Sequence, residues 1–374
     1  MNTNGVTFVT TEEERKSFIE FPYTHYANDG TWVPPLRMEQ KKLIDTKKNP
    51  YFNDAEIALF VAEKNGQIAG RISAVVDHRF NKYHDSKVGH FGFFESIDDQ
   101  YTADWLFRVA EDWLRDKGMT EVLGPASPGM MDMIGILVDG FDKQPYILMP
   151  YNKPYYEKLI LAAGFEPDMD LLAYVVNQQT VSLDRMNRAM EIVKKRNPNL
   201  VIRPVNLKKI NKEVEIVRHI YNESWKDNWG FLPLTKEELQ ATAEDFKQIL
   251  DTDFAHIAEI DGNPIGFSVA LPDYNMVFKN MKGNLFPFGF VKLLLGRRKI
   301  NRIRTALMGI LPEYRGKGID ALMHQKSIEN GMRRDFFESE LSWVLGTNQE
   351  MIRVAERIGG KLDKTYRMYR KKLV

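Results

Sequence analysis

TALMGILPEYRGKGIDALM (residues 305–323) is the stretch that decides the fold of this sequence. Its apolar first part, Ala306 to Leu311, predicts a buried strand, which ends at Pro312 because proline cannot donate to a sheet ladder. Helical spacing of apolar residues begins at Ile319. Between strand and helix lies the turn Arg315-Gly316-Lys317-Gly318. The free N–H groups of such a turn and the positive end of the helix dipole predict an anion-binding site.

The residue types of this turn suit a phosphate. Gly316 and Gly318 allow the backbone to come close to a bulky anion, and Arg315 and Lys317 add positive charge. A solvated basic loop is the alternative interpretation of the same four residues.

The turn also resembles the acyl-coenzyme A loop of the GNAT (GCN5-related N-acetyltransferase) superfamily, whose pattern is R/Q-x-x-G-x-G/A. Arg315 and Gly318 match this pattern, and Asp320 breaks it. A carboxylate would repel a pyrophosphate, so we expect Asp320 to turn outward or to serve the first helical turn. The resemblance implies that strand 305–311 splays from its neighbour and pairs with the pantetheine arm. The residues implied to bind acyl-coenzyme A are Gly309, Ile310, Leu311, Arg315, Gly316, Lys317, Gly318, Ile319 and Asp320.

Composition sets the broad class of the protein. The chain has 374 residues, of which 43% are hydrophobic and 28% charged, as in an ordinary soluble globular protein. A net charge of +1 gives no reason to expect a nucleic-acid partner. The absence of cysteine excludes disulfides, thiolate metal sites and a cysteine nucleophile, and we expect no metal. The polar segment Met1 to Glu14 is not a signal peptide, and no apolar run reaches the ~18 residues of a membrane span, so we expect a cytoplasmic protein.

The pattern of predicted elements occurs twice. Hairpin turns at Asn65-Gly66 and Asp261-Gly262-Asn263 each precede a strand, a helix and further strands, at a repeat spacing of about 195 residues. The predicted fold class is α/β (α+β), with two GNAT-like domains in tandem, each a mixed, mostly antiparallel sheet flanked by helices. The predicted segments are an irregular N-terminal cap (1–54), a degenerate GNAT-like domain (55–183), a linker (184–206) and an acyl-coenzyme A-binding GNAT domain (207–374).

The first repeat lacks the arginine-glycine turn. Its central strand is followed by Glu95-Ser96-Ile97-Asp98-Asp99, and three carboxylates at that point would repel a phosphate. We therefore expect only the second repeat to bind the acyl donor.

The resemblance covers most of the chain and extends to a group of bacterial tandem-GNAT proteins of the YghO type. Long motifs carry it, including Gly124-Pro125-Ala126-Ser127, Pro150 to Tyr156, and Trp225 to Leu234. The last of these is used by the group as a substrate-side loop. The resemblance therefore implies substrate-side roles for Trp225, Asp227, Asn228 and Trp229.

The sequence departs from the family at one catalytic position. Many GNAT enzymes have a tyrosine, seven residues after the asparagine that opens the last helix, which returns a proton to the thiolate. Here the asparagine is Asn348 and the later position is Ala355, so a proton must come from elsewhere or no chemistry occurs. Asn348 either contacts the pantetheine arm or is a simple helix N-cap.

Acylation of an amine needs a base, because an ammonium ion cannot attack a thioester. Glu340 opens the strand after the central one and is the chosen candidate, with a solvated strand end as its alternative interpretation. Asp227 and Glu223 lie near the substrate-side loop, and His256 is interpreted as a core histidine rather than a catalytic one.

The region before the central strand is basic and rich in phenylalanine. From Tyr274 to Pro312 there is no acidic residue, but there are eight cations and four phenylalanines. These features suit contact of residues 274–304 with an anionic membrane surface, or a tunnel for a long acyl chain. A packed helix with a solvated basic end is the third interpretation.

We expect an enzyme that transfers an acyl group, by default acetyl, from acyl-coenzyme A to an amine by direct attack in a ternary complex. A long-chain acyl transfer to an amphipathic amine, by a cytoplasmic protein peripheral at the inner membrane, is one alternative. A non-catalytic protein that binds or senses acyl-coenzyme A is the other.

Overall fold

The computed structural model describes residues 5–181, 183–247 and 249–373. The chain forms two compact units. Unit 1 comprises residues 1–171, 278–293 and 364–374, and unit 2 comprises residues 172–277 and 294–363. Within the described residues, no helix is both long and apolar enough to span a bilayer.

The sheet of unit 1 is mostly antiparallel. Its strands are β1 (Gly5–Phe8), β2 (Ala55–Lys64), β3 (Gln67–Asp77), β4 (Val88–Ser96), β5 (Glu121–Gly124), β8 (Ile136–Asp139) and the end of β15 (Lys361–Lys372). β4 and β5 pair in parallel, whereas β1 with β2, β2 with β3, β3 with β4, and β15 with β5 and β8 pair antiparallel. β6 (Ala126–Ser127) and β7 (Met133–Ile134) form a separate small ribbon. Asn65 and Gly66 both have positive φ, 54° and 76°, which joins β2 to β3 through the expected tight hairpin.

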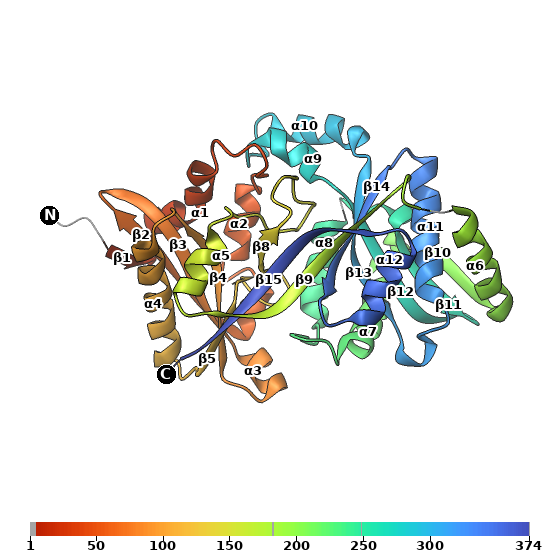
Figure 1. Cartoon of the computed structure of the whole chain (residues 1–374), viewed down its shortest axis with the longest axis horizontal. Coiled ribbons are helices and arrows are strands. Elements are labelled where there is room, and N and C mark those ends of the chain that lie inside the picture. The colour runs from red at the N-terminus through yellow and green to blue at the C-terminus, as the bar shows by residue number, and fades with distance from the viewer. Residues whose placement is uncertain (1–4, 182, 248, 374) are drawn as a thin grey trace. The chain divides into compact units, whose positions relative to one another are not determined.

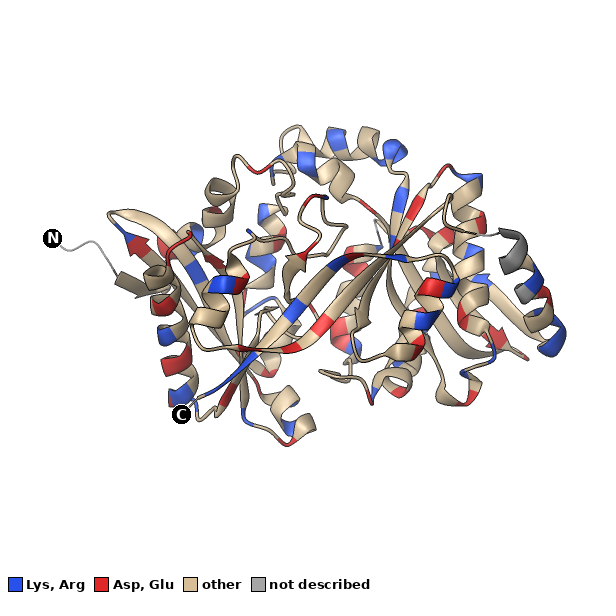
Figure 2. Ribbon diagram, in the orientation of Figure 1, with Lys and Arg blue, Asp and Glu red and all other residues tan. Residues whose placement is uncertain are grey.

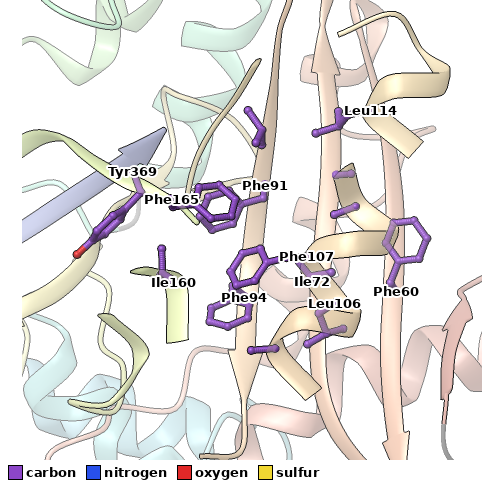
Figure 3. Close-up of a cluster of buried hydrophobic side chains, with 14 of the residues drawn as sticks. Phe60, Ile72, Phe91, Phe94, Leu106, Phe107, Leu114, Ile160, Phe165 and Tyr369 are labelled. Carbon is purple, nitrogen blue, oxygen red and sulfur yellow. The ribbon is translucent and has the colours of Figure 1, made fainter. Parts of the chain in front are cut away.

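Helices cover the sheet of unit 1. They are α1 (Glu12–His25), α2 (Arg37–Leu43), α3 (His78–His84), α4 (Gln100–Asp116) and α5 (Tyr156–Ala162). α4 packs its apolar face on the strands, and Figure 3 shows its Phe107 among the rings of Phe91, Phe94 and Phe165. The ring centroids of Phe94 and Phe107 are 4.6 Å apart. This aromatic cluster is the centre of the core of unit 1.

The sheet of unit 2 has the order β14-β13-β12-β11-β10, with β9 beside β14. Its strands are β9 (Glu166–Asn177), β10 (Leu200–Pro204), β11 (Ala255–Ile260), β12 (Asn263–Pro272), β13 (Arg302–Ile310) and β14 (Glu338–Leu345). β13 and β14 are parallel, and β10 to β13 are antiparallel neighbours. Its helices are α6 (Leu183–Arg196), α7 (Ile210–Trp225), α8 (Lys236–Phe246), α11 (Ile319–Arg333) and α12 (Gln349–Arg357) (Figure 1). Two further helices, α9 (Asn275–Phe278) and α10 (Gly289–Gly296), contain the residues at which the chain changes from one unit to the other.

The central strand β13 contains a β-bulge. Val269 of β12 pairs with Leu307, but Ala270 pairs with Thr305, so Ala306 is an extra residue. Beyond the bulge, Met308 and Ile310 pack against α11, whereas Gly309 lies under Ser224 of α7. Because successive side chains of a strand point to opposite faces, α7 and α11 cover opposite faces of this sheet.

The predicted fold class is confirmed, but the segments divide differently from the prediction. The last strand expected for each repeat is shared between units: β9 continues into unit 2, where it lies beside β14, and β15 continues into unit 1, where it pairs with β5 and β8. Periodicity predicts that a strand exists, but it does not specify which sheet the strand joins.

Two segments expected to be irregular are ordered elements of the units. Residues 1–54 contain β1, which pairs with β2, together with α1 and α2. The predicted linker 184–206 contains most of α6 and all of β10, the edge strand beside β11. Residues 184–206 are rich in charged residues, as a linker would be, although they include the edge strand β10.

Candidate active site

The parallel strands β13 and β14 separate at the centre of unit 2. They pair from Arg302 with Glu338 to Thr305 with Leu341, and no further pairing is seen in the described part of either strand. On its other edge β13 remains paired to β12 as far as Ile310 with Gly266. After Thr305, β13 therefore has no described strand partner on the edge that faces the opening, as the resemblance implies, although the carbonyl of Met308 accepts a hydrogen bond from Trp225.

The turn after β13 forms the expected helix start. Gly318 is the N-cap of α11 with φ of 77°, and no described side chain caps the helix. The N–H groups of the first turn are therefore available to an anion, and the helix dipole adds positive potential there. A Cβ atom at Gly318 would lie 2.7 Å from Cγ2 of Val193, so the backbone passes closely under α6.

The charged side chains of the turn have local partners. Arg315 donates a hydrogen bond from Nη2 to the carbonyl of Ser224 near the end of α7. Lys317 Nζ lies 4.7 Å from the ring centroid of Tyr314. Asp320 lies in the first turn of α11, and its charge acts on His324 one turn later. The candidate anion site thus consists mainly of backbone N–H groups, and Asp320 belongs to the first turn of α11.

The backbone positions before the turn are fixed by packing. A Cβ atom at Gly309 would lie 2.6 Å from Oγ of Ser224, which explains the glycine there. Ile310 contacts the apolar cluster under α11, and Leu311 donates its N–H to Ile265 at 2.9 Å. Ile319 is fully buried at the start of α11.

Glu340 is buried, not solvated, and lies beside the last paired residues of the two strands. Its side chain is 0% exposed, and Arg304 Nε lies 3.7 Å from its Oε1. Ser342 Oγ donates to the same oxygen at 2.7 Å, and Arg304 in turn donates to Ser342 Oγ at 2.7 Å. Oε2 of Glu340 has no hydrogen-bond partner among the described residues. Burial raises the pKa of Glu340 to about 7, although Arg304 opposes the shift. A carboxyl group of this pKa can accept and release a proton near neutral pH.

Asn348 forms the N-cap of α12, where its Oδ1 accepts a hydrogen bond from the N–H of Met351 at 3.1 Å. Ala355 is 2% exposed in an apolar cluster with Tyr174, Leu341 and Val344. The position of the family's tyrosine is therefore filled by packing alone.

The substrate-side segment follows α7. Trp225 Nε1 donates to the carbonyl of Met308 at 2.9 Å, which attaches the end of α7 to the central strand. Asp227 is exposed, and Asn228 and Trp229 are partly buried. Within this group, Trp225 is thus the residue that anchors the segment to β13.

Of the other candidate bases, Glu223 is half-exposed and lies 3.6 Å from Lys226, so it has no special environment. His256 lies in β11 opposite Ser268, and burial lowers its pKa to about 4. It is a core histidine, in agreement with the sequence interpretation.

Three residues of this region were not found from the sequence: Arg304, Ser342 and His324. Ser342 accompanies Glu340 because residues two apart on a strand share a face, and Arg304 lies beside Glu340 because it is the register partner of Glu340 on β13. The one available signal was Arg304 between Ile303 and the apolar run that begins at Ala306, because a buried cation requires a partner.

Comparison with known proteins agrees with this geometry. The model of the acetyltransferase (GNAT) family matches residues 214–360. Protein YghO of Escherichia coli (strain K12) is 36% identical over 370 residues, which is 97% of this chain and 94% of that protein. The bacterial ceramide synthase of Caulobacter vibrioides (strain NA1000 / CB15N) is 36% identical over 374 residues, 98% of this chain and 96% of that enzyme. The chain belongs to the GNAT family.

A solved structure supports the same fold. A tandem GNAT protein from the clavulanic acid biosynthesis pathway aligns over 99% of both chains with a TM-score of 0.57 and 11% identity. The predicted family and the prediction of an enzyme are confirmed: this GNAT protein is an acyltransferase.

Unit 1 of this GNAT protein has no comparable anion site at the corresponding helix. α4 is capped by the carboxylate of Asp99, which accepts a hydrogen bond from the N–H of Thr102 at 3.0 Å. Glu95 accepts hydrogen bonds from the hydroxyls of Tyr26 and Tyr156 at 2.6 and 2.7 Å. A capped helix start beside a buried carboxylate disfavours a phosphate.

Proposed function

We propose that this GNAT protein transfers an acyl group from acyl-coenzyme A to an amine by direct attack of the amine on the thioester. The observation that carries the proposal is the buried Glu340, with a pKa of about 7, beside the point where β13 and β14 separate. Glu340 accepts the proton of the attacking amine, a C–N bond forms, and the C–S bond breaks. The departing thiolate takes a proton from solvent, because Ala355 provides no donor.

The remaining residues bind and orient. The uncapped N-terminus of α11, from Arg315 to Asp320, fits the pyrophosphate of the coenzyme, and the unpaired edge of β13 fits the amide groups of the pantetheine arm. The hydrogen bond of Trp225 attaches the substrate-side segment to β13. Asp227, Asn228 and Trp229 come directly after this attached residue. Asn348 orients the start of α12 beside the same opening.

The relative from Caulobacter supports a lipid-like acceptor. That enzyme is named a ceramide synthase, and a ceramide is the amide of a fatty acid with a long-chain amine. We propose that the acceptor of this protein is an amphipathic amine, with a small-molecule amine and an acetyl donor as the simpler alternative.

A panel of acyl donors and amine acceptors tests the function. Purified protein is incubated with acetyl-, octanoyl- or palmitoyl-coenzyme A and either a long-chain amino alcohol or a short one, and free thiol is measured. We expect thiol release that depends on the amine. Tight binding of acyl-coenzyme A without release with any amine would favour the sensor function instead.

The surface of α10 supports contact with a membrane. Phe286, Phe288 and Leu295 are 75%, 72% and 68% exposed. Arg297-Arg298-Lys299 follows the helix directly and is exposed, and Figure 2 shows basic but no acidic residues on α10. We propose that this segment docks on an anionic bilayer, with its rings in the interface and its cations near the headgroups.

Vesicle sedimentation tests this contact. Reversing the charges of residues 297–299 should remove at least ~3 kcal/mol, at about 1 kcal/mol per cation, and thus reduce binding to anionic vesicles at least 100-fold. The matched control reverses Lys194-Lys195-Arg196, three exposed cations at the end of α6. Equal sedimentation of both variants would contradict the proposal.

A further inference from the structure

Unit 2 contains a cavity of about 60 Å³ beside the closed end of the opening between β13 and β14. Thr305 and Leu341, the last residues that pair the two strands, both line it. The remainder of the wall comes from α11, from the segment between α11 and β14, from other residues of β13 and β14, from the end of β9 and the residues after it, and from Ile358 after α12. The cavity thus begins where the opening ends.

The wall is mainly apolar. Val176, Ile303, Ile328, Phe336 and Ile358 supply most of it. One imidazole also faces this space: His324 is 5% exposed, and its Nε2 has no hydrogen-bond partner among the described residues. Burial lowers the pKa of His324, while Asp320 opposes the shift. A neutral imidazole adds no charge, but the carboxylate of Glu338, which is partly exposed at the start of β14, also lines the space. The mainly apolar remainder of the lining suits an uncharged, apolar ligand.

The cavity and Glu340 lie on opposite faces of the paired strands. Thr305 and Leu341 face the cavity, so their neighbours Arg304 and Glu340 point to the other face. An acceptor amine must reach Glu340, which assigns the acceptor to that face. The face that α11 covers then remains for the acyl group of the donor.

The distance along β13 fits the acyl donor. From Leu311, next to the anion site, back to Thr305 there are six residue steps, or about 20 Å of strand at ~3.3 Å per residue. A pantetheine arm extended along this edge would bring its thioester to the last paired residues. An acyl chain that continues past them enters the cavity.

We infer that this cavity is a binding site for the acyl chain of the donor, which makes the preferred donor longer than acetyl-coenzyme A. The inference rests on the function proposed above and specifies its acyl group. At ~10–15 Å³ for each water-sized space, 60 Å³ holds about four to six methylene groups. Longer chains leave past Met332 and Phe337, which are 39% and 49% exposed at the rim.

The inference predicts a dependence on chain length. Burying one CH₂ group strengthens binding about fourfold, so octanoyl-coenzyme A should exceed acetyl-coenzyme A in kcat/KM by roughly 100-fold or more. The gain should become small beyond about eight carbons, where additional methylene groups reach solvent.

Ser327→Leu tests the site directly, because Ser327 lines the cavity and its added side chain would fill it. We expect kcat/KM for acetyl-coenzyme A to stay within threefold and the advantage of octanoyl-coenzyme A to fall at least tenfold. Glu329→Leu is the matched control: the residue is exposed on the same helix and does not line the cavity. Thermal melting of both variants verifies folding. An unchanged chain-length profile in folded Ser327→Leu overturns the inference.

Three further measurements keep the test decisive. If Ser327→Leu does not fold, Ile328→Ala enlarges the cavity, and the optimum should move to longer donors; an optimum that does not move overturns the inference. If the wild-type protein releases no thiol, the proposed function fails, and calorimetry with acetyl- and octanoyl-coenzyme A still decides the site. Equal affinities would overturn it. The last measurement varies the chain length of the amine at a fixed acyl donor, and the effect of Ser327→Leu on kcat/KM should stay the same. If that effect changes with the length of the amine, the cavity binds the acceptor and the inference is overturned.

Discussion

Replacing Glu340 with glutamine removes the proposed base while keeping the shape of the side chain. The carboxyl group is completely buried, and its pKa of about 7 implies that half of it is ionised at neutral pH. If Glu340 accepts the proton of the amine, kcat/KM in the wild type rises with pH and levels off above about 7. At pH 5, two units lower, about 1% of the plateau should remain.

The expected loss of activity follows from the role of Glu340 as a general base. A positioned general base contributes roughly 10²- to 10⁴-fold, so Glu340→Gln should lower kcat/KM by at least 100-fold at pH 8. The loss should be smaller at pH 5, where the wild-type carboxyl group is mostly protonated. The inflection near pH 7 should disappear from the variant.

Folding stability provides a second readout. Because the folded protein raises the pKa of Glu340 from its ordinary 4.5, this group stabilises the fold below pH 4.5, and its contribution is lost as pH rises through about 7. The 2.5-unit shift corresponds to about 3 kcal/mol. The difference in unfolding free energy between pH 5 and pH 8 should therefore be smaller in Glu340→Gln than in the wild type.

The assay is thiol release between pH 5 and pH 9 with two amines of different pKa. An inflection that moves with the amine belongs to the acceptor, whereas one that stays near pH 7 belongs to the enzyme. Glu329→Gln, an exposed carboxylate on α11, is the control. If Glu340→Gln keeps more than a third of the wild-type activity at pH 8 and the same inflection, Glu340 is not the base.

Three other changes probe the fold and the coenzyme site. Gly318→Val should abolish binding of coenzyme A in calorimetry, because the residue has φ of 77° and its Cβ would meet Val193; normal binding would refute the site. A fragment of residues 200–374 should show no cooperative unfolding transition, because it lacks β9, whose Tyr174 and Val176 complete the cluster around Leu341. A sharp transition would contradict the conclusion that β9 is part of the sheet of unit 2. Phe107→Ala should cost about 3–5 kcal/mol in chemical denaturation, against less than 1 kcal/mol for the exposed Leu161→Ala, and similar costs would argue against the aromatic core.

The sequence predicted best where short-range geometry decides the structure. The two hairpins, the helix Ile319–Arg333 and the glycine turn before it follow from residues a few positions apart, and the structure has all of them. The positions of β9 and β15 could not be predicted in this way. Their apolar alternation suits either sheet, and only pairing over long sequence separations selects the partner.

The environment of Glu340 was equally inaccessible to the sequence. A glutamate at the start of a strand is exposed in most proteins, and here burial beside Arg304 and Ser342 changes its pKa. The alternation of Arg304 and Thr305, with Glu340 and Leu341 opposite them, predicts which residues share a face. It does not predict that one face holds a buried ion pair and the other a cavity.

The two faces of this strand pair explain how one opening can serve two substrates of different polarity. The face of Glu340 contains a charged pair and a hydroxyl, and it suits an amine that must lose a proton. The face of Leu341 contains an apolar cavity and suits an acyl chain. The thioester can join the two faces only where β13 and β14 separate, because below Thr305 the ladder is closed. We therefore propose that the reaction takes place at the last paired residues, with the bulge at Ala306 directly beside them.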